Sequence, residues 1–220
     1  MAVSQRQRET VRALLDEHGR TYAEEAGIHL KDTPQPLYQL VVLATLLSAR
    51  IKAQVATAAA RALFEAGLGD PRRMADADWQ RRVDALGEGH YRRYDERTAT
   101  QLGEGAALLL DRYGGDVRRM RQASDGDPDA LRRSLREVPG IGPVGADIFI
   151  REAQSLWPEF GPFFDDKAVR GAGRVGLPTS PEELAHLAGR ERWAALAAAL
   201  VRSALDKDVA EEVGESAGHR

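Results

Sequence analysis

Two short segments of the chain carry residues that could do chemistry. Residues 139–143 read Pro-Gly-Ile-Gly-Pro, and further along stand the two carboxylates Asp165 and Asp166. Glycines leave backbone N–H groups uncovered, and a helix that starts after them adds free N–H groups and a partial positive charge, so the first segment could bind an anion. A fixed carboxylate can stabilise a developing positive charge or orient a water molecule. The two segments together suggest an anion site coupled to a carboxylate.

The anion site requires two helices joined by a tight turn. Pro139 ends a strong helix-forming stretch, because proline lacks an N–H and disfavours helical backbone in the residue before it. Gly140 and Gly142 permit positive φ and close backbone approach, and Pro143 suits the first position of a second helix. Residues 131–155 are therefore predicted to form helix, hairpin and helix. A plain interhelical turn has the same Pro-Gly-x-Gly pattern, so the pattern alone does not establish a binding site.

The order of these segments resembles the helix-hairpin-helix, Gly-Pro-Asp superfamily of DNA glycosylases, of which endonuclease III is the type. Ile141 supplies an apolar hairpin tip, and Asp165 stands where that family has its catalytic aspartate, with Arg170 and Arg174 at the family's arginine offsets. Residues 46–50, Leu-Leu-Ser-Ala-Arg, resemble the family segment Leu-Leu-Ser-Ala-Gln, which enters DNA from the minor-groove side. The resemblance covers about two thirds of the chain and is specific as an ordered set.

The resemblance implies a DNA glycosylase of base excision repair, which flips a damaged or mispaired base out of the duplex and hydrolyses its N-glycosidic bond. Asp165 is the candidate catalytic carboxylate and Asp166 the alternative, and either could also cap the helix that begins near Lys167. The residues expected to contact DNA are Arg50, which would fill the gap in the base stack, Pro139, Gly140, Ile141, Gly142, Val144, Gly145, Arg170 and Arg174. The residues expected at the base pocket are Tyr38, Phe163, Phe164 and Lys167.

One residue inside the hairpin departs from part of the family. Val144 stands where bifunctional members have a lysine, whose amine attacks the sugar and allows strand cleavage. Valine cannot do this, so we expect a monofunctional glycosylase. Two alternatives stay open: a catalytically inactive DNA-binding protein that keeps the hairpin, and a glycosylase with lyase activity through Lys52 or Lys167.

Composition limits the cofactors. The chain has no cysteine, which excludes disulfides, thiolate zinc sites and the cysteine-held iron–sulfur cluster that endonuclease III and many relatives carry. We expect no cofactor and no metal bound by side chains. The resemblance implies only a K⁺ or Na⁺ ion on hairpin carbonyls near Val138 and Ile141.

Charge and hydropathy limit the partners and the location. The net charge is −3, so binding to phosphates has to depend on local clusters of arginine rather than on bulk charge. No apolar run is long enough to span a membrane and no secretory leader is visible. These features predict a cytoplasmic protein, and together with the family resemblance we expect a nucleoid-associated monomer whose partner is double-stranded DNA containing a lesion.

Helical periodicity extends almost along the whole chain, and no window alternates polar and apolar residues as a strand would, so we predict an all-α fold. By analogy with the family, residues 33–155 form a central helical domain that includes the hairpin. Residues 1–32 and 156–206 form a second helical domain that carries the aspartate loop, and a cleft between the two domains holds DNA. Residues 207–220 are polar and glycine-containing and are expected to be a disordered tail.

Overall fold

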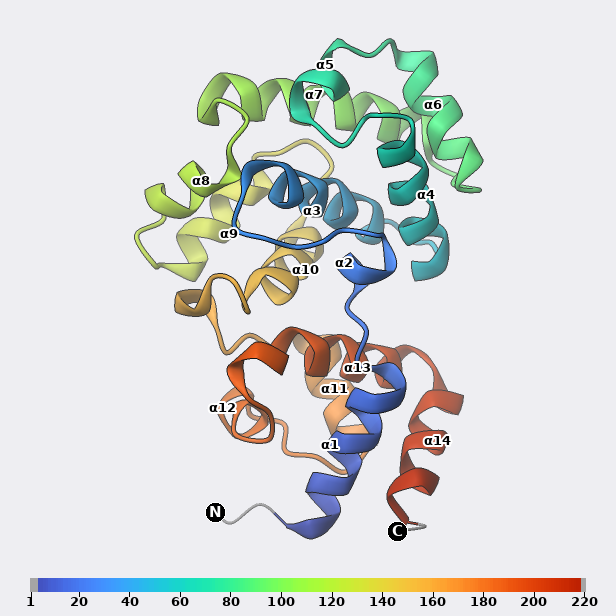
Figure 1. Cartoon of the computed structure of the whole chain (residues 1–220), viewed down its shortest axis with the longest axis vertical. Coiled ribbons are helices and arrows are strands. Elements are labelled where there is room, and N and C mark those ends of the chain that lie inside the picture. The colour runs from blue at the N-terminus through green and yellow to red at the C-terminus, as the bar shows by residue number, and fades with distance from the viewer. Residues whose placement is uncertain (1–3, 219–220) are drawn as a thin grey trace. The chain divides into compact units, whose positions relative to one another are not determined.

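The computed structural model describes residues 4–218, which form α-helices and short 3-10 helices and contain no strand in that range (Figure 1). The all-α prediction is thereby confirmed. None of the described helices is both long enough and apolar enough to cross a membrane.

The described chain divides into two compact units. The central unit is Ala23–Phe149, and the terminal unit combines the described residues up to Tyr22 with those from Ile150 onward. The helices of the central unit are α3 (Pro34–Leu47), α4 (Ala53–Glu65), α5 (Pro71–Asp76), α6 (Trp79–Glu88), α7 (Asp95–Tyr113), α8 (Val117–Ala123) and α9 (Pro128–Arg136). The helices of the terminal unit are α1 (Gln5–His18), η1 (Pro158–Phe160), α11 (Asp166–Arg174), α12 (Pro181–Ala185), η2 (Arg190–Arg192), α13 (Trp193–Leu205) and α14 (Lys207–Gly218). The short α2 (Tyr22–Glu25) and α10 (Pro143–Ala153) include the two unit boundaries.

Both boundaries lie earlier in the chain than the predicted ones, which followed residues 32 and 155. Residues 23–32 belong to the central unit because Arg61 of α4 donates a hydrogen bond to the Glu25 carbonyl and Arg121 of α8 pairs with Asp32. The last turn of α10 belongs to the terminal unit, where Arg151 pairs with Asp165.

Helix α3 forms the buried centre of the central unit (Figure 1). Leu37, Tyr38 and every residue from Leu40 to Leu46 are buried. The helix starts at Pro34, because proline at the first position of a helix costs no hydrogen bond. Helices α4 and α8 pack against it, while α6 and α7 pack on each other and on α4 and α5, respectively.

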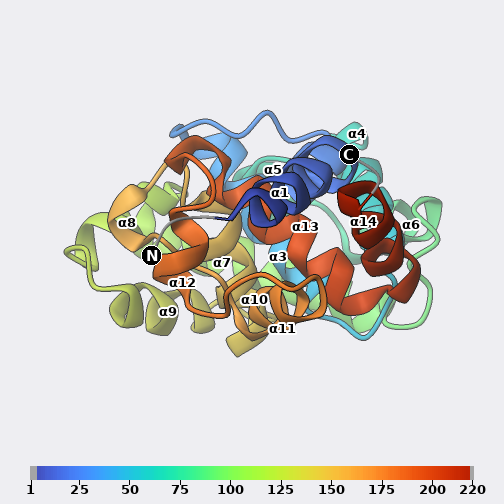
Figure 2. The ribbon, with the colours of Figure 1, turned by 90° about the horizontal axis from the view of Figure 1, so that it is seen from below.

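Helix α13 plays the same part in the terminal unit, with Leu196 and Leu200 completely buried. Helix α11 packs on α13 so closely that a side chain on Gly171 would collide with the Leu200 carbonyl oxygen. The α11 and α13 backbones therefore touch at a point where only glycine fits. Helix α1 lies against both α13 and α14, and Figure 2 shows this group from below.

The expectation of a disordered tail from residue 207 is corrected for the residues that the structure describes. Residues 207–218 form α14, whose first turn is capped by the Asp206 carboxylate accepting the Asp208 N–H at 3.0 Å. Val213 is completely buried and Ala217 is 8% exposed, in a helix that packs on α1. Their spacing of four residues gives the segment an apolar stripe despite its polar composition. Residues 219–220 lie outside the described range.

Candidate functional site

The hairpin has the predicted helix-hairpin-helix form, between α9 and α10. Gly140 has φ +90°, and a Cβ atom there would lie 2.8 Å from Thr45 Cγ2, so both backbone and packing require glycine. Ile141 is 4% exposed and forms the buried tip, and its N–H donates to the Val138 carbonyl at 3.0 Å. The turn is therefore closed on itself and packed into the central unit.

Helix α10 begins in close contact with α3. A Cβ atom on Gly145 would lie 3.4 Å from Ser48 Cβ and 3.5 Å from the Ala44 carbonyl oxygen. The Ser48 hydroxyl lies 3.3 Å from the Gly140 carbonyl oxygen, which links the end of α3 to the hairpin. Asp147 accepts a hydrogen bond of 2.9 Å from Arg132 Nε, which ties α10 to α9. Side chains thus hold the hairpin from behind.

The opposite face of the hairpin is open. Of the two glycines that permit positive φ, Gly142 does not adopt it, and a Cβ atom there would meet no heavy atom within 4 Å. Val144, in the first turn of α10, is 45% exposed, which is unusual for an apolar side chain in this protein. The first N–H groups of a helix have no partner within it. The start of α10 therefore offers main-chain donors beside an uncovered glycine.

The loop that follows α3 belongs to the same region. Ser48 anchors this loop to the hairpin, and Arg50, the predicted gap-filling residue, is exposed two residues later. Lys52 is exposed at the N-cap of α4. The structure therefore brings together, within the central unit, the hairpin and the loop that the sequence predicted to contact DNA.

Asp165 lies in the terminal unit and is the N-cap of α11. Its Oδ1 accepts hydrogen bonds from the N–H groups of Lys167 at 3.0 Å and Ala168 at 2.9 Å. Its Oδ2 accepts a hydrogen bond and ion pair from Arg151 Nη1. The side chain of Asp165 is 10% exposed, whereas Asp166 is exposed in the first turn of the helix. The capping role considered from the sequence is confirmed for Asp165.

Arg151, which pairs with the candidate residue Asp165, is a member of the candidate site that sequence reasoning missed. Its side chain is 3% exposed, its guanidinium lies 5.6 Å from the centre of the Tyr22 ring, and its Nε makes no hydrogen bond although Glu152 Oε1 is 3.9 Å away. A buried charge is stable only when it is paired, so Arg151 and Asp165 depend on each other. The only signal in the sequence is that Arg151 and Glu152 directly follow the apolar run Ile148-Phe149-Ile150.

Gln154 was also missed. Its side chain is completely buried, and its amide accepts the Phe163 N–H and donates to the Phe163 carbonyl, both at 2.9 Å. The Gln154 side chain therefore fixes the aspartate loop by bonding both main-chain groups of Phe163. Phe164, the residue before Asp165, is 5% exposed and packs in the core.

The remaining predicted residues are distributed as follows. Phe163 and Lys167 are half-buried beside Asp165, and Arg170 is exposed on α11. Arg174 donates to the carbonyl oxygens of Ser203 at 3.2 Å and Ala204 at 2.6 Å, and so stabilises the C-terminal end of α13. This contact gives Arg174 a structural role, in contrast to the DNA contact expected of it.

Tyr38 lies in the core of the central unit and is 1% exposed. Burial raises the pKa of its hydroxyl well above the ordinary value. A ring with almost no accessible surface cannot stack on a base that enters from solvent. We therefore assign Tyr38 to the core and not to a base pocket.

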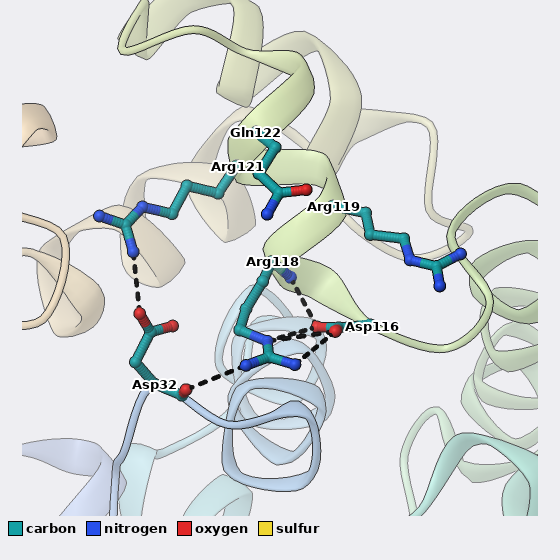
Figure 3. Close-up of a pocket in the computed structure, with 6 residues that line it drawn as sticks. All are labelled: Asp32, Asp116, Arg118, Arg119, Arg121 and Gln122. Atoms are coloured by element: carbon teal, nitrogen blue, oxygen red, sulfur yellow. Dashed lines mark hydrogen bonds and ion pairs between the residues drawn. The ribbon is translucent and has the colours of Figure 1, made fainter.

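The central unit also contains a polar pocket of about 420 Å³ (Figure 3). It is lined by Asp32, Asp116, Arg118, Arg119, Arg121 and Gln122, none of which is a predicted site residue. Arg118 Nη2 lies 2.7 Å from Asp116 Oδ2, and Arg121 Nη1 lies 2.9 Å from Asp32 Oδ2. The hydrogen bond from Arg118 lowers the pKa of Asp116. The two carboxylates thus offset two of the three guanidinium charges that line the pocket.

Comparison with known proteins identifies the fold. A solved structure of a non-covalent endonuclease III–DNA complex matches 92% of this chain and 86% of that chain, with a TM-score of 0.54 and 19% sequence identity. A trapped endonuclease III–DNA covalent intermediate, in an estranged-adenine complex, matches the same shares at the same identity with a TM-score of 0.48. No family model and no curated protein matches the sequence. The chain therefore has the endonuclease III fold, as its hairpin and ordered motifs predicted.

Proposed function

We propose that this protein is a monofunctional DNA glycosylase, which hydrolyses the bond between a damaged or mispaired base and its deoxyribose. The observation that carries the proposal is the open start of α10, where Gly142 and Val144 leave main-chain donors accessible in a fold shared with endonuclease III. Such donors bind phosphate oxygens of a DNA backbone without reading its sequence. The proposed partner is double-stranded DNA that contains a lesion.

In this proposal Asp165 acts on the sugar. As the base leaves, the deoxyribose acquires oxocarbenium character, which a nearby carboxylate stabilises. Two main-chain N–H groups and Arg151 hold the Asp165 carboxylate in one orientation, so it would need no rearrangement during the reaction. Asp166 is exposed and makes none of these contacts, which favours Asp165 among the two candidates.

The absence of an amine at position 144 supports a reaction that stops at base release. Val144 is exposed at the start of α10, where an amine would be needed for attack on the sugar. Lys52 and Lys167 are the alternative amines. Borohydride treatment during the reaction tests them, because a covalent adduct that disappears in Lys52→Ala or Lys167→Ala would indicate lyase activity, and no adduct is expected.

One observation favours a second candidate function, that of a DNA-binding protein without catalysis. Both oxygens of Asp165 have protein partners, and its side chain is only 10% exposed. A carboxylate that is already paired with a guanidinium has less negative potential to offer a positively charged sugar. This candidate predicts salt-sensitive binding to duplex DNA and no base release from any lesion.

The experiment that separates the two uses duplexes that each carry a single damaged or mispaired base. Alkali added after the incubation converts abasic sites into strand breaks, so a monofunctional enzyme is detected. We expect base release from at least one duplex, a loss of about 10²–10³-fold in Asp165→Asn, and near-normal release in the matched control Asp166→Asn. Normal activity in both variants contradicts the assignment of the site, and no release by the unmodified protein from any duplex supports the binding protein.

A further inference from the structure

Helices α1 and α14, which come from opposite ends of the chain, lie side by side in the terminal unit (Figures 1 and 2). Glu17 and His18 end α1, and Glu212 lies on α14. Each of the three offers one ligand atom, and these atoms all lie within 4.8 Å of one another. The proposed glycosylase reaction assigns no role to any of the three.

The His18 imidazole is the most informative member of this cluster. Its Nε2 atom is inaccessible to solvent and makes no hydrogen bond, while the side chain as a whole is 15% exposed. The distance from Nε2 to Glu212 Oε2 is 3.4 Å, which is longer than a usual N–H···O hydrogen bond of about 2.9–3.0 Å. Two ligand atoms at about 2.0–2.2 Å from a tetrahedral metal ion are about 3.3–3.6 Å apart. The spacing therefore fits two ligands of one ion better than a direct hydrogen bond.

The electrostatic surroundings also favour a cation. The C-terminal end of α1 carries a partial negative charge from its last carbonyl groups, in addition to the two carboxylates. The Ser216 hydroxyl lies 3.2 Å from Glu17 Oε1 and orients that carboxylate. Arg202 donates a hydrogen bond to the His18 main-chain carbonyl at 2.9 Å, and its guanidinium lies 4.5 Å from the centre of the Tyr22 ring.

We propose that Glu17, His18 and Glu212 form a binding site for a divalent transition metal, with Zn²⁺ as the best fit. One imidazole nitrogen and two carboxylate oxygens are ligands that Zn²⁺ accepts, and water completes the tetrahedron. The ion fastens α14 to α1, so its role is structural. The earlier expectation that side chains bind no metal is revised by this proposal.

Isothermal titration of the full chain with Zn²⁺, after treatment with a chelator, tests the proposal. We expect one ion per chain and a rise in the melting temperature when Zn²⁺ is added. His18→Ala and Glu212→Gln should each weaken Zn²⁺ binding by roughly 10- to 100-fold or more. Loss of a residue that only hydrogen-bonds to a metal ligand already has an effect of that size. The matched control is His186→Ala, which removes a histidine from the end of α12 in the same unit and leaves binding unchanged.

The variants are expected to fold, so a loss of Zn²⁺ binding can be assigned to the missing ligand. The Arg202 contact is to the main chain of His18, so it survives the substitution, and circular dichroism checks the helix content. Glu17→Gln, which alters an exposed side chain, provides a third ligand variant. Equal Zn²⁺ affinity in the unmodified protein and His18→Ala overturns the proposal, as does absence of Zn²⁺ binding by the unmodified protein. Neither result depends on whether the protein releases bases.

Discussion

The hairpin and the aspartate loop present their functional groups in opposite ways. In the hairpin, the proposed contacts to DNA are main-chain N–H groups at the start of α10, and side chains such as Arg132 and Ser48 only hold the turn. In the aspartate loop the functional group is the Asp165 side chain, which is itself one half of a buried ion pair. Changes in the hairpin should therefore separate binding from stability, whereas changes in the aspartate loop should affect both.

The largest effect is expected from Arg151→Met. This change removes the guanidinium partner of the nearly buried Asp165 carboxylate, which keeps only its main-chain N–H donors, and breaking such a pair costs about 3–5 kcal/mol in the free energy of unfolding. Urea denaturation measures it. The control Arg170→Met, at an exposed position on α11, should change stability by less than about 0.5 kcal/mol. The double variant Arg151→Met, Asp165→Asn should recover part of the loss, and a strictly additive double variant would contradict the coupling of the two residues.

A smaller effect is expected from alanine at the two hairpin glycines, which form a matched pair. Gly140→Ala should destabilise the fold by about 1–3 kcal/mol, because its φ of +90° is strained for alanine and the new Cβ meets Thr45. Gly142→Ala should leave stability nearly unchanged, since neither its φ nor its surroundings require glycine. It should weaken binding to duplex DNA, measured by fluorescence anisotropy, because the methyl group covers the proposed phosphate site. Equal DNA affinity in Gly142→Ala and the unmodified protein would show that the open face of the hairpin is not used.

The smallest effect is expected at the ion pair between Asp116 and Arg118, which is partly buried and therefore serves as a reference for the nearly buried pair of Arg151 and Asp165. The pKa of Asp116 is lower in the folded protein than its ordinary value, so its contribution to stability is present at neutral pH and is lost as the pH falls through the folded-state pKa. Asp116→Asn keeps a side chain that can cap α8 and removes the charge. The free energy of unfolding, measured between about pH 7 and pH 2, should depend less on pH in this variant than in the unmodified protein. The difference between the two should be less than about 1 kcal/mol. A larger effect than that of Arg151→Met would reverse the ranking of the two pairs.

Local patterns in the sequence predicted most of the helices. The described residues form helices and no strand, as predicted, and the hairpin lies between the helices expected on either side of Pro139. These features depend on short-range rules of capping and proline geometry, which a single sequence displays. Asp165 was predicted as a possible cap for the same reason.

The residues that were missed depend on contacts between distant parts of the chain. Arg151 reads in sequence as one charge on a helix, and nothing in its neighbours shows that the chain returns to place Asp165 beside it. Tyr38 and Arg174 were assigned from family positions or aromatic character, but burial and the end of α13 determine their roles. Val213 was not predicted as a core residue, because the segment around it is mostly charged and polar. It is buried only because α14 packs on α1.

The contact between Gly171 and the Leu200 carbonyl oxygen has a consequence for mutational scanning of this protein. Helix α11 carries Asp165 at its start, and any side chain at position 171 pushes that helix away from α13. A saturation library selected for activity would retain only glycine there, and the position would score like a residue of the reaction centre. The selection would in fact be reporting the distance between two helix backbones.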